Sequence, residues 1–140
     1  MDRYDELEDA TLGMTPEQTL AFLLPHAEAG DAAAQCLLAD AYDDHTFGPR
    51  NPVESVAWYR KSAAQGYLRA QFYLGSMIHY GIGVGKDIHE AVHWFRLAAE
   101  KGDCAAQFRL GEILAKGEID LPSVFRLPTG GFHATCFSIG

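Results

Sequence analysis

No run of apolar residues in this 140-residue sequence approaches the roughly 20 that a membrane-spanning helix requires. The first residues show no basic patch followed by an apolar stretch, so we expect no secretory signal. Three cysteines, an odd number without metal-ligand spacing, argue against a closed disulfide framework. This cysteine usage favours a reduced, cytoplasmic protein.

Basic residues are few. Eleven Lys and Arg stand against 19 Asp and Glu, which gives a formal net charge of −8. Such a chain repels phosphate backbones and anionic lipid headgroups, so we expect no nucleic-acid partner and no membrane partner. The excess is largest in residues 1–14, an acidic N-terminal segment in which the first nine residues carry −4. We expect this segment to be solvated and frayed.

The sequence contains enough apolar residues for a core, because 48% of it is hydrophobic, and its length suits one domain. The chain also repeats itself every 36 residues. Positions that share a residue type at this offset are Gly30, Gly66 and Gly102; Ala34, Ala70 and Ala106; Gln35, Gln71 and Gln107; Leu38, Leu74 and Leu110; Glu54 and Glu90; Trp58 and Trp94; Arg60 and Arg96. Such a period indicates a repeat architecture.

Each unit is predicted to contain two helices. The first helices are expected at 31–44, 68–80 and 104–116, where apolar residues recur with a 3.6-residue period, and the second helices at 51–65 and 87–101. Asn51 and Asp87 are good N-caps, and Gly66 and Gly102 suit helix C-caps. A lone second helix at 15–29 precedes these five main helices, and Pro25 predicts a kink or a break in it.

The motif residues resemble a known family. Gly66-x-x-x-Ala70-Gln71-x-x-Leu74-Gly75, Gly81-x-Gly83-Val84-x-x-Asp87 and Ala91-x-x-Trp94-Phe95-x-x-Ala98-Ala99 are similar to the Sel1-like repeat, a relative of the tetratricopeptide repeat. The resemblance covers about residues 15–117, with units at 30–65, 66–101 and 102–117, the last one partial. It implies an all-α fold, a right-handed superhelical α/α solenoid of about two and a half repeats.

The similarity stops at residues 118–140, an irregular and apolar C-terminal tail with Pro122, Pro128, Gly130 and Gly131. Two interpretations remain open. The tail caps the last helix, because the terminal unit of a solenoid needs a cover, or it is a poorly ordered terminus. Seven large apolar residues favour capping.

Two motifs suggest chemistry. His89-Glu90-Ala91-Val92-His93 matches H-E-x-x-H, the helix signature of zinc proteases. However, the helical period places His89 and His93 on the outer face, away from the apolar stripe, so we expect a coincidence on the solvent face. Gly81 to Asp87 looks like a phosphate-binding loop, but Tyr80 and Asp87 break the pattern, and we expect an inter-helix turn.

Two functions therefore remain. The family resemblance implies a non-catalytic protein-interaction module without a cofactor or a metal, such as a bacterial adaptor, regulatory or immunity-type scaffold. The alternative is a small zinc-dependent hydrolase using His89 and His93. Placing the motif on its tetratricopeptide counterpart predicts a concave partner-binding surface of Asp40, Asp43, Asp44, Arg69, Phe72, Ser76, His79, Tyr80, Phe108, Glu112 and Lys116, with Cys36 and Ala115 beside them. This aromatic strip with carboxylates suits a basic protein or peptide with an apolar anchor.

Overall fold

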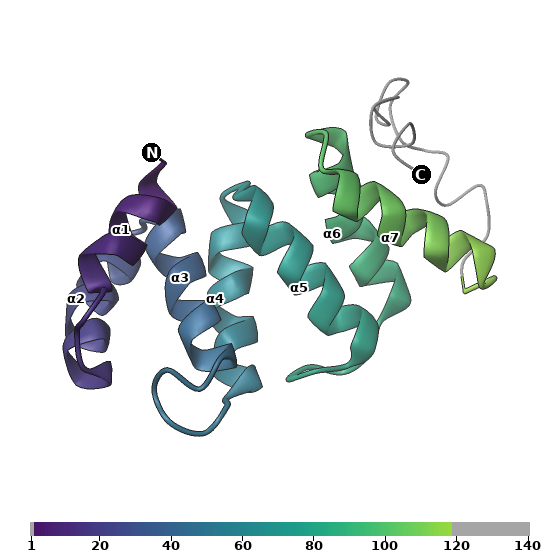
Figure 1. Ribbon diagram of the computed structural model, residues 1–140. Helices are drawn as coiled ribbons and strands as arrows, with labels where there is room; N and C mark the ends of the chain where they lie inside the picture. Colours follow the sequence, from purple (N-terminus) through teal and green to yellow (C-terminus); the bar gives the residue numbers. More distant parts are fainter. Residues whose placement is uncertain (1, 119–140) are drawn as a thin grey trace.

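The protein is all-α over residues 2–118, which are the residues that the computed structural model describes. Its seven helices form a row along the chain (Figure 1). They are α1 (Arg3–Thr11), α2 (Pro16–Glu28), α3 (Ala32–Asp43), α4 (Pro52–Ala64), α5 (Leu68–Tyr80), α6 (Ile88–Glu100) and α7 (Cys104–Ala115). The five predicted main helices, α3 to α7, are present with ends within one residue of the expected ones. The all-α solenoid is confirmed.

From α2 onward each helix packs against the next one in the chain. In Figure 1, α3, α5 and α7 lie on one side of the row, and α2, α4 and α6 lie behind them. We call the surface built by α1, α3, α5 and α7 the first-helix face. No helix among residues 2–118 has the length and apolar character needed to cross a membrane.

The helix ends repeat with the sequence period. At Gly30, Gly66 and Gly102 the backbone has positive φ angles of 99°, 89° and 90°. This left-handed conformation favours glycine and ends each second helix in the same way. The next amide reaches back to an orphan carbonyl of that helix, in the bonds Asp31 N to His26 O, Tyr67 N to Ser62 O and Asp103 N to Ala98 O, of 3.1, 3.3 and 3.2 Å.

Consecutive helix pairs are joined by a buried glutamine. The side-chain amides of Gln35, Gln71 and Gln107 donate to the carbonyl oxygens of Ala27, Ala63 and Ala99 at 3.0, 3.3 and 3.3 Å. These carbonyls lie in the last turn of the preceding second helix, where each also accepts the backbone amide of Gly30, Gly66 or Gly102. The repeated glutamine therefore adds a second hydrogen bond at a helix end and ties each helix pair to the preceding one.

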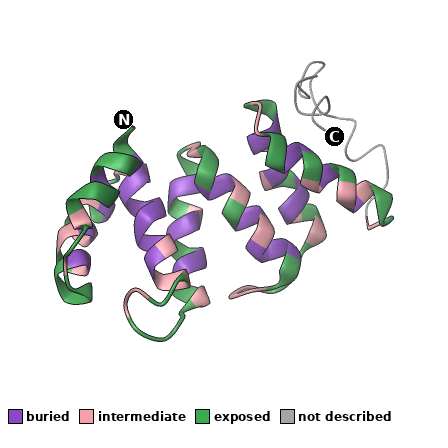
Figure 2. Ribbon diagram, in the orientation of Figure 1, coloured by how far each residue is buried: buried purple, intermediate pink, exposed green. Residues whose placement is uncertain are grey.

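Small and large apolar residues share the core. Buried residues form a continuous band through the row of helices (Figure 2). Ala34, Ala63, Ala70 and Ala99 are almost fully buried where helices approach closely. The two tryptophans differ, because Trp58 is buried whereas Trp94 is half-buried against the core.

The N-terminal segment is solvated as predicted, because Asp5, Glu6, Glu8 and Asp9 are exposed, but it is not frayed. Residues 3–11 form helix α1, whose N-cap Asp2 accepts the amide of Asp5 at 2.9 Å. Tyr4 and Leu7 are only 9% and 2% exposed to solvent. Two apolar residues one turn apart are thus enough to dock an otherwise acidic helix against α3.

Two other expectations concern chain breaks. A break at Pro25 is not found, because α2 continues from Pro16 to Glu28 with the proline in its last turns. The glycine-rich segment between α5 and α6 is an inter-helix turn as expected, and a Cβ atom on Gly83 would lie 2.4 Å from the carbonyl oxygen of Pro52. The two interpretations of the tail concern residues 119–140, which lie outside the described residues.

Candidate functional site

The first-helix face has a hollow of about 270 Å³ between α1, α3 and α5. Its walls combine carboxylates, tyrosine rings and one guanidinium, and are formed by Tyr4, Glu8, Asp40, Asp43, Asp44, Tyr59, Arg69 and Tyr73. We call it the acidic pocket. Four carboxylates and one guanidinium line it.

Asp40 is the centre of the acidic pocket. Its carboxylate accepts hydrogen bonds from the hydroxyls of Tyr4 and Tyr59, and from Nε of Arg69 at 3.2 Å. The Arg69 guanidinium lies 4.6 Å from the ring centre of Tyr4 and 4.9 Å from that of Tyr73. Burial and the neighbouring Asp40 carboxylate raise the pKa of Tyr4 and Tyr59, so both phenols stay neutral donors. Asp40 therefore links α3 to α1, α4 and α5 through hydrogen bonds.

The other predicted aspartates are less constrained. Asp43 pairs with Nε of Arg50 at 2.8 Å, and Asp44 accepts the backbone amide of Thr46 at 2.9 Å. Among residues 2–118, neither Asp44 nor Glu8 forms an ion pair with a basic side chain. These two carboxylates are available to a cation from outside.

A second hollow of about 320 Å³ lies between α5 and α7, and it shares Arg69 and Tyr73 with the acidic pocket. It is formed by Leu68, Arg69, Phe72, Tyr73, Asp103 and Ala105, and we call it the apolar pocket. The rings of Phe72 and Phe95 are 5.8 Å apart, so Phe72 joins the pocket to the core.

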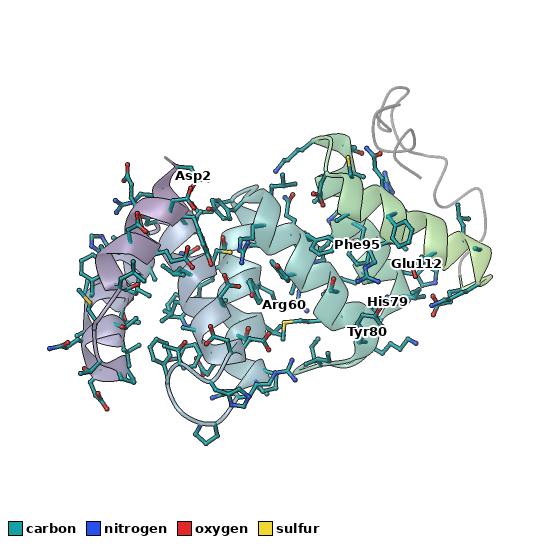
Figure 3. The ribbon with its side chains drawn as sticks, in the orientation of Figure 1. Asp2, Arg60, His79, Tyr80, Phe95 and Glu112 are labelled. Atoms are coloured by element: carbon teal, nitrogen blue, oxygen red, sulfur yellow. The ribbon has the colours of Figure 1, made fainter. Side chains whose placement is uncertain are left out.

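The remaining predicted residues lie toward the ends of α5 and α7, where Figure 3 shows His79, Tyr80 and Glu112 close together. His79 is 5% exposed and its Nε2 lies 3.1 Å from Oε2 of Glu118. Tyr80 is 54% exposed, and its hydroxyl accepts from Arg109 at 3.3 Å. Arg109 also pairs with Glu112 at 3.2 Å.

The predicted surface is thus divided into two groups rather than one strip. Asp40, Asp43, Asp44, Arg69 and Phe72 line the acidic and apolar pockets, whereas His79, Tyr80 and Glu112 form the group at the helix ends. The last three predicted residues are Ser76 on α5, Phe108 on α7 and Lys116 at the C-cap of α7. Ser76 is half-buried, while Phe108 and Lys116 are exposed.

Two placements contradict the expected solvent-facing surface. His79 is buried because it packs against Phe95, with ring centres 6.4 Å apart, and contacts Glu118. Cys36 is fully buried, and this burial raises the pKa of its thiol.

Sequence reasoning did not include four pocket residues, Tyr4, Glu8, Tyr59 and Tyr73. Tyr4 and Glu8 come from α1, which was not expected. Its signal was the spacing of Tyr4 and Leu7, which puts two apolar side chains on one side of a helix.

The H-E-x-x-H motif lies on the outer side of α6. His89 and His93 are exposed, as predicted. The Glu90 carboxylate accepts two hydrogen bonds from the Arg60 guanidinium, at 2.9 and 3.2 Å. No group of three His, Cys, Asp or Glu side chains within residues 2–118 is arranged to hold a metal ion. The motif thus has neither a third ligand in that range nor an unengaged base.

Comparison with known proteins agrees with this architecture. Two curated relatives are an F-box protein of Arabidopsis thaliana, 44% identical over 55 residues, and chitin synthase regulatory factor 3 of Schizosaccharomyces pombe, 31% identical over 123 residues. The matches cover 39% and 60% of this chain but only 15% and 13% of those proteins. The chain therefore spans a small part of the length of each relative.

Solved structures show the same fold. A protective antigen of uropathogenic Escherichia coli with an SLR fold matches 78% of this chain and 23% of its own, at 33% identity and a TM-score of 0.72. A Sel1 repeat protein from Oxalobacter formigenes matches 84% of this chain and 47% of its own, at 31% identity and a TM-score of 0.70. The family model of the Sel1 repeat matches residues 32–67, 68–103 and 104–127. This chain belongs to the Sel1 repeat family.

Proposed function

We propose that the protein is a non-catalytic interaction module, an adaptor, regulatory or immunity-type scaffold that binds a basic protein or peptide on its first-helix face. Sel1 repeats generally mediate protein–protein interactions. The observation that carries the proposal is the acidic pocket, which is lined by four carboxylates, two of them, Glu8 and Asp44, without an ion-pair partner in residues 2–118.

The charge of the whole chain supports a basic partner. A net charge of −8 attracts cationic proteins over a distance of about 10 Å at moderate salt. Charges at the rim of a surface mainly speed association, whereas aromatic side chains in desolvated pockets hold the complex. The first-helix face supplies both, because tyrosines line the same hollow as the carboxylates.

The names of two relatives favour a regulatory or adaptor role within this proposal. One is called a regulatory factor and the other an F-box protein. The hydrolase alternative receives no support from the site, because Glu90 is bound to Arg60 and the two histidines face away from both pockets. We do not propose it.

A comparative pull-down tests the proposal. The immobilised parent, a Glu8→Gln/Asp44→Asn variant and a Glu28→Gln/Glu100→Gln control are incubated with the same lysate, and retained proteins are identified by mass spectrometry. The control removes the same charge from exposed positions on α2 and α6. We expect a basic protein that the parent and the control retain and the pocket variant loses. Equal retention by all three proteins would contradict the proposal.

A further inference from the structure

The two pockets of the first-helix face adjoin one another. Both are lined by Arg69 and Tyr73 of α5, so these two side chains form a common wall between them. Resting on the proposed function, we propose that the face binds an extended peptide segment by two neighbouring side chains. An arginine enters the acidic pocket and a large apolar side chain enters the apolar pocket.

The acidic pocket has the chemistry of a guanidinium site. Arg69 already shows how this environment holds such a group, with its guanidinium near the rings of Tyr4 and Tyr73 and its Nε bonded to Asp40. Tyr59 and Tyr73 stack at 5.9 Å and 21°, and Tyr73 is the exposed ring of this pair because Tyr59 is buried. Guanidinium groups prefer aromatic faces combined with carboxylates.

Arg69 does not satisfy the whole pocket. It reaches Asp40, whereas Glu8 on α1 and Asp44 at the end of α3 remain without a basic partner in residues 2–118. These two carboxylates line the same pocket as tyrosine side chains, which suits an organic cation. Arginine fits better than lysine, since its planar fork can bond to separate carboxylates, whereas the rings of Tyr4 and Tyr73 are already covered by Arg69.

The apolar pocket gives the site its second contact. Leu68 and Tyr73 are 36% and 37% exposed, large values for apolar side chains that line a hollow. The two charged members of this pocket are already engaged: Asp103 is the N-cap of α7 and accepts the amide of Ala106 at 3.0 Å, and Arg69 donates to Asp40 at 3.2 Å. An apolar side chain entering here therefore displaces water mostly from carbon surface.

The positions of the two pockets define the path of the peptide across the first-helix face. The acidic pocket lies toward α1 and α3, and the apolar pocket lies toward α7, with α5 between them. A segment that fills both must cross α5 over Arg69 and Tyr73. Helix α1 belongs to this site because it contributes both Tyr4 and Glu8.

Capped synthetic peptides containing one arginine and one phenylalanine in a Gly/Ser background test this inference. The spacing of the two residues grows one residue at a time through the series, and binding is followed by backbone NMR shifts and isothermal titration. We expect one spacing to bind best. Replacing its arginine by neutral citrulline, or its phenylalanine by alanine, should each weaken binding by about tenfold, as expected for a hot-spot contact.

Variants then assign each side chain to its pocket. Glu8→Gln/Asp44→Asn should remove the preference for arginine over citrulline and keep that for phenylalanine. Ala105→Phe, which fills the apolar pocket from an exposed position, should remove the preference for phenylalanine over alanine and keep that for arginine over citrulline. Glu28→Gln/Glu100→Gln and Ala57→Phe, at exposed positions on α2, α6 and α4, should preserve both preferences. Thermal melting shows that each variant is folded.

The outcomes separate this inference from the function on which it rests. Peptides that bind with no preference for arginine over citrulline, or for phenylalanine over alanine, overturn the two-pocket inference. So does an absence of peptide shifts on the first-helix face when the pull-down still depends on Glu8 and Asp44. If the pull-down is also insensitive to these carboxylates, the proposed function fails as well.

Discussion

Arg60 and Glu90 connect the second helices of consecutive repeats through two parallel hydrogen bonds of 2.9 and 3.2 Å. The two residues are 30 positions apart and belong to α4 and α6. The glutamate that would be the catalytic base of a zinc protease is therefore a structural partner. Its recurrence as Glu54 one repeat earlier is consistent with a role in the repeat rather than in chemistry.

Glu90→Gln is expected to affect stability and not hydrolysis. The pair is partly exposed, with side chains 41% and 29% accessible, so solvent weakens the interaction. A double-mutant cycle with Arg60→Gln should give a coupling of about 0.5 kcal/mol that shrinks at high salt. Peptidase assays with added zinc should show no activity in either protein. Activity that the parent has and Glu90→Gln loses would instead support the hydrolase.

The repeated glutamines carry a second prediction. Gln71→Ala removes the hydrogen bond from the glutamine side chain to the Ala63 carbonyl, which then keeps only backbone partners such as the Gly66 amide at 2.9 Å. We expect a loss of about 0.5–1.5 kcal/mol in the free energy of unfolding, measured by urea denaturation. Glu100→Gln, an exposed change on the neighbouring α6, is the control and should change stability little. A Gln71→Ala protein as stable as the parent would show that this bond is not a repeat junction.

Gly75 and Gly111 occupy the same repeat position and should respond oppositely to alanine. A Cβ atom on Gly75 would lie 3.0 Å from the buried ring of Phe95, whereas no described atom lies within 4 Å of one on Gly111. Gly111→Ala should stabilise the protein by up to about 1 kcal/mol through helix propensity. Gly75→Ala should destabilise it by about 1–3 kcal/mol through overpacking.

Thermal melting of the two alanine variants checks this prediction, and the double variant should show additive changes. Position 39, the counterpart in the preceding repeat, is already a fully buried alanine, so the position itself tolerates a methyl group. Equal shifts for Gly75→Ala and Gly111→Ala would mean that the Phe95 ring moves aside without cost.

The helices from 31 to 116 could be predicted because their information is local and repeated. The segment 68–80, for example, has an apolar period, a preceding Gly66 and a following Gly81, and it forms α5 over the predicted range. The turn after it could be predicted for the same reason, because glycines mark where the helix must end.

Helix α1 could not be predicted from the sequence, because its stability does not come from local interactions. A nine-residue helix is marginal alone, and α1 depends on Tyr4 contacting Asp40 and Arg69, which are far away in the sequence. His79 shows the same effect. The helical period allows it to face solvent, but packing against Phe95 and Glu118 buries it.

Three tyrosines with raised pKa values should make the protein sensitive to alkali. Burial raises the pKa of Tyr67 to about 12, and it also raises the pKa of Tyr4 and Tyr59. In the unfolded chain a tyrosine loses its proton near pH 10. Above that pH the unfolded state binds fewer protons than the folded state, so the free energy of unfolding falls as pH rises. Stability from these groups is complete below about pH 10.

Tyr4→Phe separates the contribution of α1 from the rest. At neutral pH it should lower the free energy of unfolding by about 1–2 kcal/mol, because Asp40 loses a donor. The fall in stability above pH 10 should then be less steep, because one of the shifted phenols is gone.

Tyr80→Phe removes a hydroxyl from a ring that is 54% exposed and is the matched control. Urea denaturation from pH 8 to pH 11 measures both quantities, with hydrogen exchange of the α1 amides as a local readout. If Tyr4→Phe leaves the neutral stability, the alkaline slope and the α1 exchange rates unchanged, the contact between Tyr4 and Asp40 does not hold α1 on the first-helix face.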